Sequence, residues 1–495
     1  MSITDIPQTT AEPSPSPGIH RSETRKALFA TAIRLHFYAG VFVAPFILIA
    51  ALTGALYAIA PTMEQVVNRD LLHVNSSGPA RPLADQVVAG VAAEPKLALA
   101  AVDPAQRPGD TTRVLFADPS LGESEQRAVF VDPATARPVG TAVVYGSSGS
   151  LPLRTWIDQL HRNLHLGQPG RLYSEVAASW LWIIALAGVV VWVRRIRARH
   201  DRNTARRLLW PDRGRTGRLR TMNWHAAVGI WILLPLLFLS TTGMTWSTYA
   251  GAHMDSLREQ LSWTSPTVGT SLSGSSARHS NSSMPGMDMP GRDTPGTAVP
   301  PGGMESERGK PSPAAWVDRV VTVAHIHGVR GSVEITVPAT DDTAYVVKQR
   351  RISGQLTQDA IAIDGRTGAV VDLVRFADWP LMAKLANWGI QLHMGMMFGL
   401  ANQLLLLATM IALITVILRG YLMWWHHRPT RTGGSAFGTP PRRGTLRRLP
   451  ATGIALLAAI TVLVGWFAPL LGISLLGFLI VDLALGLNRS RRASA

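Results

Sequence analysis

Long apolar runs alternate with polar segments along this chain. The runs are roughly 20 residues long, the length that crosses a hydrocarbon core of about 30 Å. Those at 34–60, 173–194, 223–247 and 395–419 predict four membrane spans. A longer run at 451–487 is interrupted by glycine and proline, and predicts two further spans joined by a tight turn. The pattern predicts a polytopic α-helical membrane protein with about six spans.

Two segments between the spans have the alternation of short strands. AVFVDPATARPVG (128–140) parallels AIAIDGRTGAVVD (360–372), and each reads as a strand, a turn and a second strand. These hairpins predict a small folded domain in each long segment that separates two spans.

The formal net charge of +16 is concentrated in two loops. Residues 194–220 contain eleven arginines and two acids, and residues 419–448 contain seven arginines and no acid. Such clusters remain in the cytoplasm, so both termini are predicted inside and the two hairpin-bearing segments outside. The charge therefore indicates topology in the cytoplasmic membrane and not nucleic-acid binding. The absence of cysteine excludes disulfides, iron–sulfur clusters and covalently attached haem.

The first and third spans share one skeleton. In each, a histidine is followed by glycine, threonine and glycine at offsets of 4, 17 and 18. The shared positions are His36, Gly40, Thr53 and Gly54 in one span and His225, Gly229, Thr242 and Gly243 in the other. The second and fourth spans follow a common Leu-His-x-Gly, which contains His165 and His393. The chain thus reads as a duplicated unit of span, outer domain and span.

The second unit is longer by a stretch at 264–312 that is rich in Ser, Gly, Pro and Met and reads as a disordered insertion. The predicted order is a disordered cytoplasmic tail (1–27), a span (28–60), an outer domain (61–172), a span (173–194), an arginine-rich cytoplasmic loop (195–222), a span (223–247), a second outer domain (248–394), a span (395–419), a cytoplasmic loop (420–450), a pair of spans (451–487) and a basic tail (488–495).

The repeated histidines form two predicted pairs. Parallel repeats pack about an axis along the membrane normal, which brings His36 towards His225 near the inner face and His165 towards His393 near the outer face. Two imidazoles from facing helices suit low-spin haem b, so we expect two such haems. A histidine at the edge of a span is also commonly an interfacial residue that bonds to water or to a carbonyl. Zinc is disfavoured because no carboxylate accompanies either pair.

Three further residues belong to this hypothesis. His161 lies one turn before His165 and is either a substitute ligand or a surface residue. Arg34 and Arg220 lie near the inner pair, where they either hold haem propionates or anchor the spans at the inner face.

These motifs resemble the PepSY-associated transmembrane proteins, a group that includes iron-regulated membrane proteins and ferric-siderophore reductases. The resemblance covers roughly residues 28–428. It implies small α+β PepSY domains outside the membrane and, in reductase members, b-type haems held by span histidines. Carried over to this chain, the ligands fall on His36, His225, His165 and His393.

The insertion carries a second candidate site. HSNSSMPGMDMPG supplies His279, Met284, Met287 and Met289, and thioether and imidazole ligands suit copper. The other interpretation is a linker in which methionines accumulated.

The sequence favours a haem-dependent transmembrane reductase that passes electrons outward to a ferric chelate or to Cu(II), from an unidentified donor. Two alternatives stay open: a PepSY protein without enzymatic activity that binds an extracytoplasmic partner, and a copper-handling membrane protein.

Overall fold

The computed structural model describes residues 17–197, 209–210, 214, 216–273, 313–426, 451–478 and 480. Three of its helices are long and apolar enough to cross a membrane: α2 (Ala44–Val67), α6 (Gln168–Arg197) and α13 (Leu400–Trp425). Helices α8 (Gly217–Trp231) and α9 (Leu233–Met244) meet at a bend of 59° and provide a fourth span if they are counted together. The chain is therefore a membrane protein with three or four such spans among its described residues.

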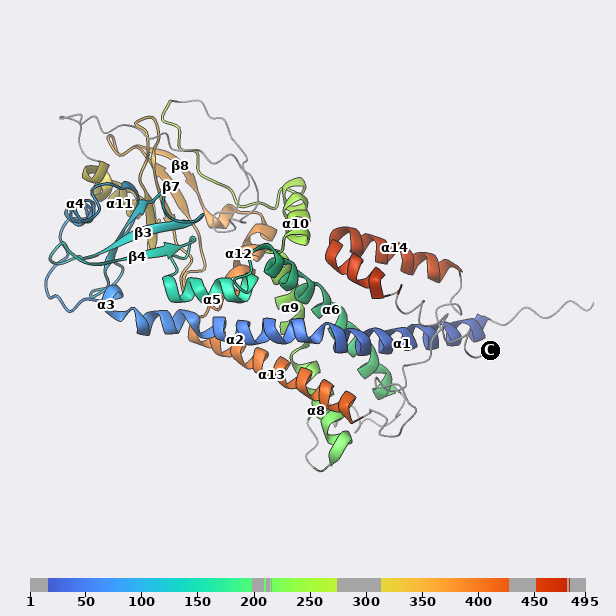
Figure 1. The fold of residues 1–495 in the computed structure, drawn as a ribbon. Coiled ribbons are helices and arrows are strands. Elements are labelled where there is room, and N and C mark those ends of the chain that lie inside the picture. The colour runs from blue at the N-terminus through green and yellow to red at the C-terminus, as the bar shows by residue number, and fades with distance from the viewer. Residues whose placement is uncertain are drawn as a thin grey trace, which may run out of the picture. The chain divides into compact units, whose positions relative to one another are not determined.

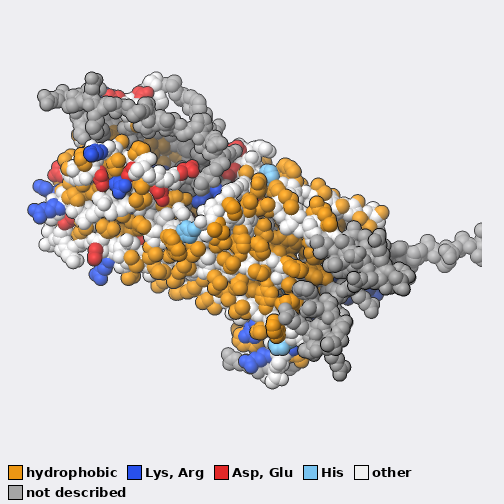
Figure 2. Space-filling view, in the orientation of Figure 1, with side chains coloured by type: hydrophobic (Ala, Val, Ile, Leu, Met, Phe, Trp, Pro, Cys, Tyr) orange, Lys and Arg blue, Asp and Glu red, His pale blue; other side chains and the backbone are white. Residues whose placement is uncertain are grey.

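The surface of these helices is apolar, as contact with lipid requires. Figure 2 shows hydrophobic side chains covering the visible face of the helical part, while charged side chains gather over the strands. The exposed apolar residues on the long helices include Leu52, Leu186, Val190, Leu404, Leu405, Ile411 and Leu418.

Proline interrupts the first and third spans. Helix α1 (Pro17–Phe42) ends three residues before Pro45, and α8 ends at Trp231, four residues before Pro235. Proline has no N–H, so Pro45 leaves the carbonyl of Val41 without its helical donor. The hydroxyl of Tyr421 donates to that carbonyl at 2.8 Å. The break is thus compensated by a side chain from another span.

The two ends of the chain differ from the simplest expectation. Helix α1 begins at Pro17, inside the segment predicted as a disordered tail, and residues 1–16 lie outside the described part. At the other end, α14 (Ala451–Phe467) and a helix at Pro469–Phe478 lie in the segment predicted as a pair of spans, and each is shorter than a typical span. Gly465 and Gly472 lie close together where the two helices meet: a Cβ at Gly472 would lie 2.8 Å from the Cα of Gly465.

The strands form one sheet and not two separate domains. Its order is β4-β3-β2-β1-β5-β6-β7-β8, antiparallel throughout (Figure 1). The first four strands are β1 (Ala98–Asp103), β2 (Thr112–Ala117), β3 (Glu125–Asp132) and β4 (Arg137–Tyr145). The second four are β5 (Val333–Thr336), β6 (Tyr345–Gln349), β7 (Ala360–Ile363) and β8 (Val370–Val374). The two predicted hairpins are β3–β4 and β7–β8.

Each set of four strands has its own helix, and the two helices share one core. Helices α4 (Leu83–Ala93) and α11 (Val317–Ile326) cover one face of the sheet. Their apolar side chains pack with strand residues of both sets; buried members include Val87, Val102, Phe116, Val320, Ile335 and Ile361. The carboxylate of Asp318 in α11 accepts hydrogen bonds from the N–H groups of Leu83 and Ala84 at the start of α4. The two sets of four strands are therefore joined by a shared hydrophobic core, by the hydrogen bonds from the start of α4 to Asp318 and by the pairing of β1 with β5.

Short helices connect the sheet to the spans. They are α3 (Arg69–Leu72), α5 (Pro152–Asn163), α10 (Tyr249–Gln260) and α12 (Leu381–His393). Helix α5 is anchored by a buried carboxylate: Glu64 in α2 accepts the N–H of Leu151 at 2.7 Å and lies 3.6 Å from the guanidinium of Arg154. Helix α10 is anchored in the same way, because Glu175 accepts the N–H groups of Tyr249 and Ala250.

Candidate histidine site

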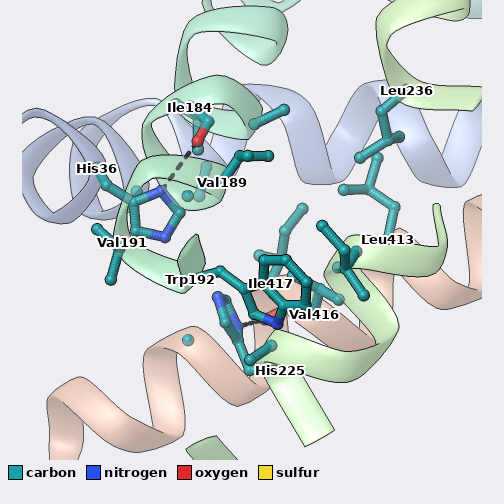
Figure 3. A pocket seen from close by; sticks show the side chains of 18 of the residues that line it. His36, Ile184, Val189, Val191, Trp192, His225, Leu236, Leu413, Val416 and Ile417 are labelled. Atoms are coloured by element: carbon teal, nitrogen blue, oxygen red, sulfur yellow. Dashed lines mark hydrogen bonds between the residues drawn. The ribbon is translucent and has the colours of Figure 1, made fainter. Parts of the chain in front are cut away.

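His36 and His225 come together as predicted. His36 lies in α1 and His225 in α8, and their ring centroids are 6.1 Å apart with planes inclined at 81°. Figure 3 shows the two rings turned towards one another. The two rings therefore meet in an edge-to-face arrangement.

Backbone carbonyls fix the proton on both rings. Nδ1 of His36 lies 2.9 Å from the carbonyl oxygen of Ile184, and Nδ1 of His225 lies 2.9 Å from that of Val416. A carbonyl oxygen can only accept, so Nδ1 is the protonated nitrogen in each neutral ring. The lone pair is consequently on Nε2, the arrangement found in histidines that bind metals.

An apolar cavity of about 390 Å³ adjoins the pair. It is lined by residues of α1, α2, α6, α8, α9 and α13, including Gly40 and Gly229. A Cβ at either glycine would meet no atom within 4 Å, so both glycines open space within the cavity. The indole N–H of Trp192 also borders it and has no hydrogen-bond partner among the described residues. An apolar cavity that also offers the indole N–H of Trp192 as a hydrogen-bond donor suits a flat molecule that carries acidic groups.

Two further glycines let neighbouring helices approach the rings. A Cβ at Gly188 would lie 3.0 Å from Cε1 of His36, and one at Gly420 would lie 3.7 Å from Cε1 of His225. The sequence analysis did not identify this pair; Gly188 lies six residues before Arg194, and Gly420 directly follows Arg419.

The structure relates His393 to a different histidine from the one expected. His161, at the end of α5, lies with Nδ1 2.9 Å from the hydroxyl of Thr53. His393, at the end of α12, lies with Nδ1 2.7 Å from the hydroxyl of Thr242. Because Thr53 and Thr242 occupy corresponding positions of the predicted repeat, His161 and His393 correspond to each other.

Aromatic neighbours follow the same correspondence. Tyr57 stacks on His161 with centroids 6.2 Å apart, and Trp246 meets the edge of His393 at 5.0 Å. Each aromatic residue comes four positions after its threonine. Burial lowers the pKa of His161 to about 4. Burial and the charge of His161 lower the pKa of His393 to about 3, so both rings are neutral at neutral pH.

His165 lies apart from this arrangement. Helix α5 ends at Asn163, and Leu164 and His165 both adopt left-handed backbone, with φ of 54° and 55°. The turn leaves His165 exposed and stacked on Trp156, with centroids 4.9 Å apart. The expectation that His165 is the counterpart of His393 therefore differs from the structure, since the turn removes it from the helix that carries His161.

Comparison with known proteins decides the family. The family model described as the PepSY-associated TM region matches residues 33–427. The chain belongs to this PepSY-associated family. No curated protein matched the chain. The match spans both histidine pairs and the whole sheet, and ends before the C-terminal hairpin.

The other residues predicted to bind a cofactor or a metal in this PepSY-associated protein either do not line the cavity or fall outside the described residues. Arg220 is exposed, and the arginine that lines the cavity is Arg195, in place of Arg34 or Arg220. The copper candidates lie outside the described residues: His279, Met284, Met287 and Met289. Within the described part of the chain, no group of three or more His, Asp or Glu side chains is arranged to hold a metal ion.

The sequence contains a second repeated motif that bears on which histidine corresponds to His393. Gln-Leu-His occurs at 159–161 and again at 391–393, and it aligns His161 with His393. The Leu-His-x-Gly match, which aligns His165 with His393, concealed it. Thr53 and Thr242 stand at repeated positions of the sequence, and the structure shows that the hydroxyl of each contacts a histidine ring.

Proposed function

We propose that this membrane protein binds two b-type haems and carries electrons outward across the cytoplasmic membrane to a ferric chelate or to Cu(II). The observation that carries the proposal is the His36–His225 pair beside an apolar cavity. The membrane donor and the outer acceptor are unidentified partners in this proposal, and the termini and the two arginine-rich loops are placed in the cytoplasm.

The geometry of the pair supports His36 and His225 as residues that would hold one iron between them. Metal–imidazole bonds are about 2 Å long, so two rings on one metal have centroids about 6 Å apart. The observed 6.1 Å agrees with this distance. Because Ile184 and Val416 accept the Nδ1 protons, both Nε2 atoms present lone pairs without any change of tautomer.

The protein supplies the ligands, the orientation and a dry environment. Bound haem would supply one-electron chemistry at its iron. His36 and His225 would hold the iron, and the apolar lining of the cavity excludes water from it. The indole N–H of Trp192 and the guanidinium of Arg195 are donors that suit propionate carboxylates.

His161 and His393 are the proposed ligands of the second haem. Each contacts a threonine that comes 17 residues after His36 or His225 in the sequence, and we propose that this second site serves the outer side of the membrane. Two sites divide a distance that is too long for a single electron transfer. The neutrality of both rings keeps their lone pairs available at physiological pH.

The visible spectrum of the purified protein tests the proposal. We expect a sharp reduced band of bis-histidine haem b in the wild type, partly lost in both His36→Ala and His225→Ala. His426→Ala is the matched control, because His426 is exposed and bonds to the carbonyl of Leu422 in its own helix. A colourless wild-type protein after expression with added haem would refute electron transfer and favour a PepSY protein that binds a partner.

A further inference from the structure

We call His161 and His393 the outer pair, and His36 and His225 the inner pair. Side-chain hydroxyls contact the rings of the outer pair, whereas backbone carbonyls contact the rings of the inner pair. The hydroxyls of Thr53 and Thr242 contact Nδ1 of His161 and His393 at 2.9 and 2.7 Å. A hydroxyl can either donate or accept, so the direction of these bonds has to be established.

At Thr53 the helix settles the direction. The hydroxyl lies 2.9 Å from the carbonyl oxygen of Ile49 and 3.2 Å from that of Ala50, and its single hydrogen is donated to this pair of acceptors. Its oxygen therefore accepts from His161, which must carry its proton on Nδ1. Nε2 of His161 then has the lone pair.

Neighbouring groups keep the ring in place. A Cβ at Gly54 would lie 3.1 Å from Cε1 of His161, so any side chain there would crowd the imidazole. Tyr57 stacks on the ring at 6.2 Å with planes only 17° apart. With its plane fixed by Tyr57 and its Nδ1 fixed by Thr53, His161 has little freedom to present the other nitrogen.

We propose that Thr53 is a positioning residue that fixes the proton on Nδ1 of His161 and thereby sets the reduction potential of the outer haem, and that Thr242, its counterpart in the repeat, acts in the same way on His393. This inference rests on the proposed function. An acceptor at Nδ1 makes imidazole a stronger donor to iron and favours the ferric form. Loss of either hydroxyl should therefore raise the potential of the outer haem and leave that of the inner haem unchanged.

The test is a redox titration of the full-length protein followed by visible and electron paramagnetic resonance spectra. Thr53→Val keeps the shape of the side chain and removes the acceptor, while Thr53→Ser keeps the acceptor and removes a methyl group. We expect Val to shift one of two components to higher potential, or to abolish it, and Ser to match the wild type. The same pair of variants at Thr242 should act on the same component.

Thr409→Val is the matched control. Thr409 is buried in α13 and donates to the carbonyl of Leu405 at 2.8 Å, but it contacts no histidine among the described residues. It should leave both components unchanged.

The opposite results would overturn the inference. If Ser shifts the component and Val does not, packing and not hydrogen bonding sets the potential. If Thr53→Val matches the wild type, the hydroxyl has no such role. Loss of both haems in Thr53→Val would indicate a folding defect, and the Ser variant then decides, since a shift there contradicts the inference. If two haems are bound and neither reduction potential changes when either threonine is replaced, this inference alone is refuted. A colourless wild-type protein would refute the proposed function as well.

Discussion

His161 and His165 give the sharpest test of the outer site, because they are four residues apart and have opposite surroundings. His161→Ala removes a ring that bonds Thr53 and stacks on Tyr57. His165→Ala removes an exposed ring that contacts Trp156. We expect the first variant to lose one of the two haems, halving the haem content, and the second to keep both.

The expected stability changes show that both variants should remain folded. A lost hydrogen bond costs about 1 kcal/mol, and the void left by the ring brings the total for His161→Ala to about 1–3 kcal/mol. An exposed residue with one ring contact should change stability by less than about 1 kcal/mol when replaced, as in His165→Ala. Both costs are small against the stability expected of a chain of this size.

The assay is haem quantification per protein in detergent, together with a thermal melt of each variant. The His36–His225 signal serves as the internal control, since neither variant touches the inner cavity. If His165→Ala halves the haem content and His161→Ala does not, the correspondence of His161 with His393 is refuted and the original alignment of His165 is restored.

Three further predictions follow from the structure. Gly229→Leu should fill the cavity and abolish the inner haem signal without lowering the melting temperature, because a Cβ there meets no atom within 4 Å. The control is Gly477→Leu, at an equally open glycine outside the cavity, which should keep the signal. Glu175→Leu should raise hydrogen exchange at the start of α10 and cost about 1–2 kcal/mol, because both carboxylate oxygens accept N–H groups there; unchanged exchange would contradict the capping role. Burial raises the pKa of Asp364, but hydrogen bonds led by that from Thr367 outweigh it and hold the pKa below its usual range. The stability from Asp364 is therefore present above the unfolded pKa of about 3.9 and lost as the pH falls below it, and Asp364→Asn should remove that part of the acid sensitivity in a pH series of melts.

The spans and the inner pair could be predicted because local pattern determines them. Apolar length identifies α2, α6 and α13, and the repeated skeleton relates His36 to His225. The hydroxyl of Tyr421 that satisfies the carbonyl of Val41 could not be foreseen, because nothing near Pro45 in the sequence identifies which residue of another span will reach it.

The correspondence of His161 with His393 could not be read from the sequence because two motifs point to different histidines. Gln-Leu-His and Leu-His-x-Gly share His393 in 391–395 but are separate at 159–161 and 164–167, and only the left-handed turn at Leu164 and His165 decides between them. Left-handed backbone at non-glycine residues is uncommon and has a weak sequence signature. The continuous sheet was also unpredictable, since strand alternation indicates that hairpins form but not which edges of distant hairpins meet.

The pairing of β1 with β5 has a consequence for biosynthesis. Val102 in β1 pairs with Ile335 in β5, which is synthesised more than 200 residues later, after two spans have been inserted. At about 5–20 residues per second, the edge of β1 remains open for roughly ten seconds to a minute during synthesis. An open strand edge is a template for pairing with other chains. The first four strands therefore need their open edge covered during synthesis. The supply of a chaperone that covers β1 until β5 is made would then limit the yield of correctly assembled protein.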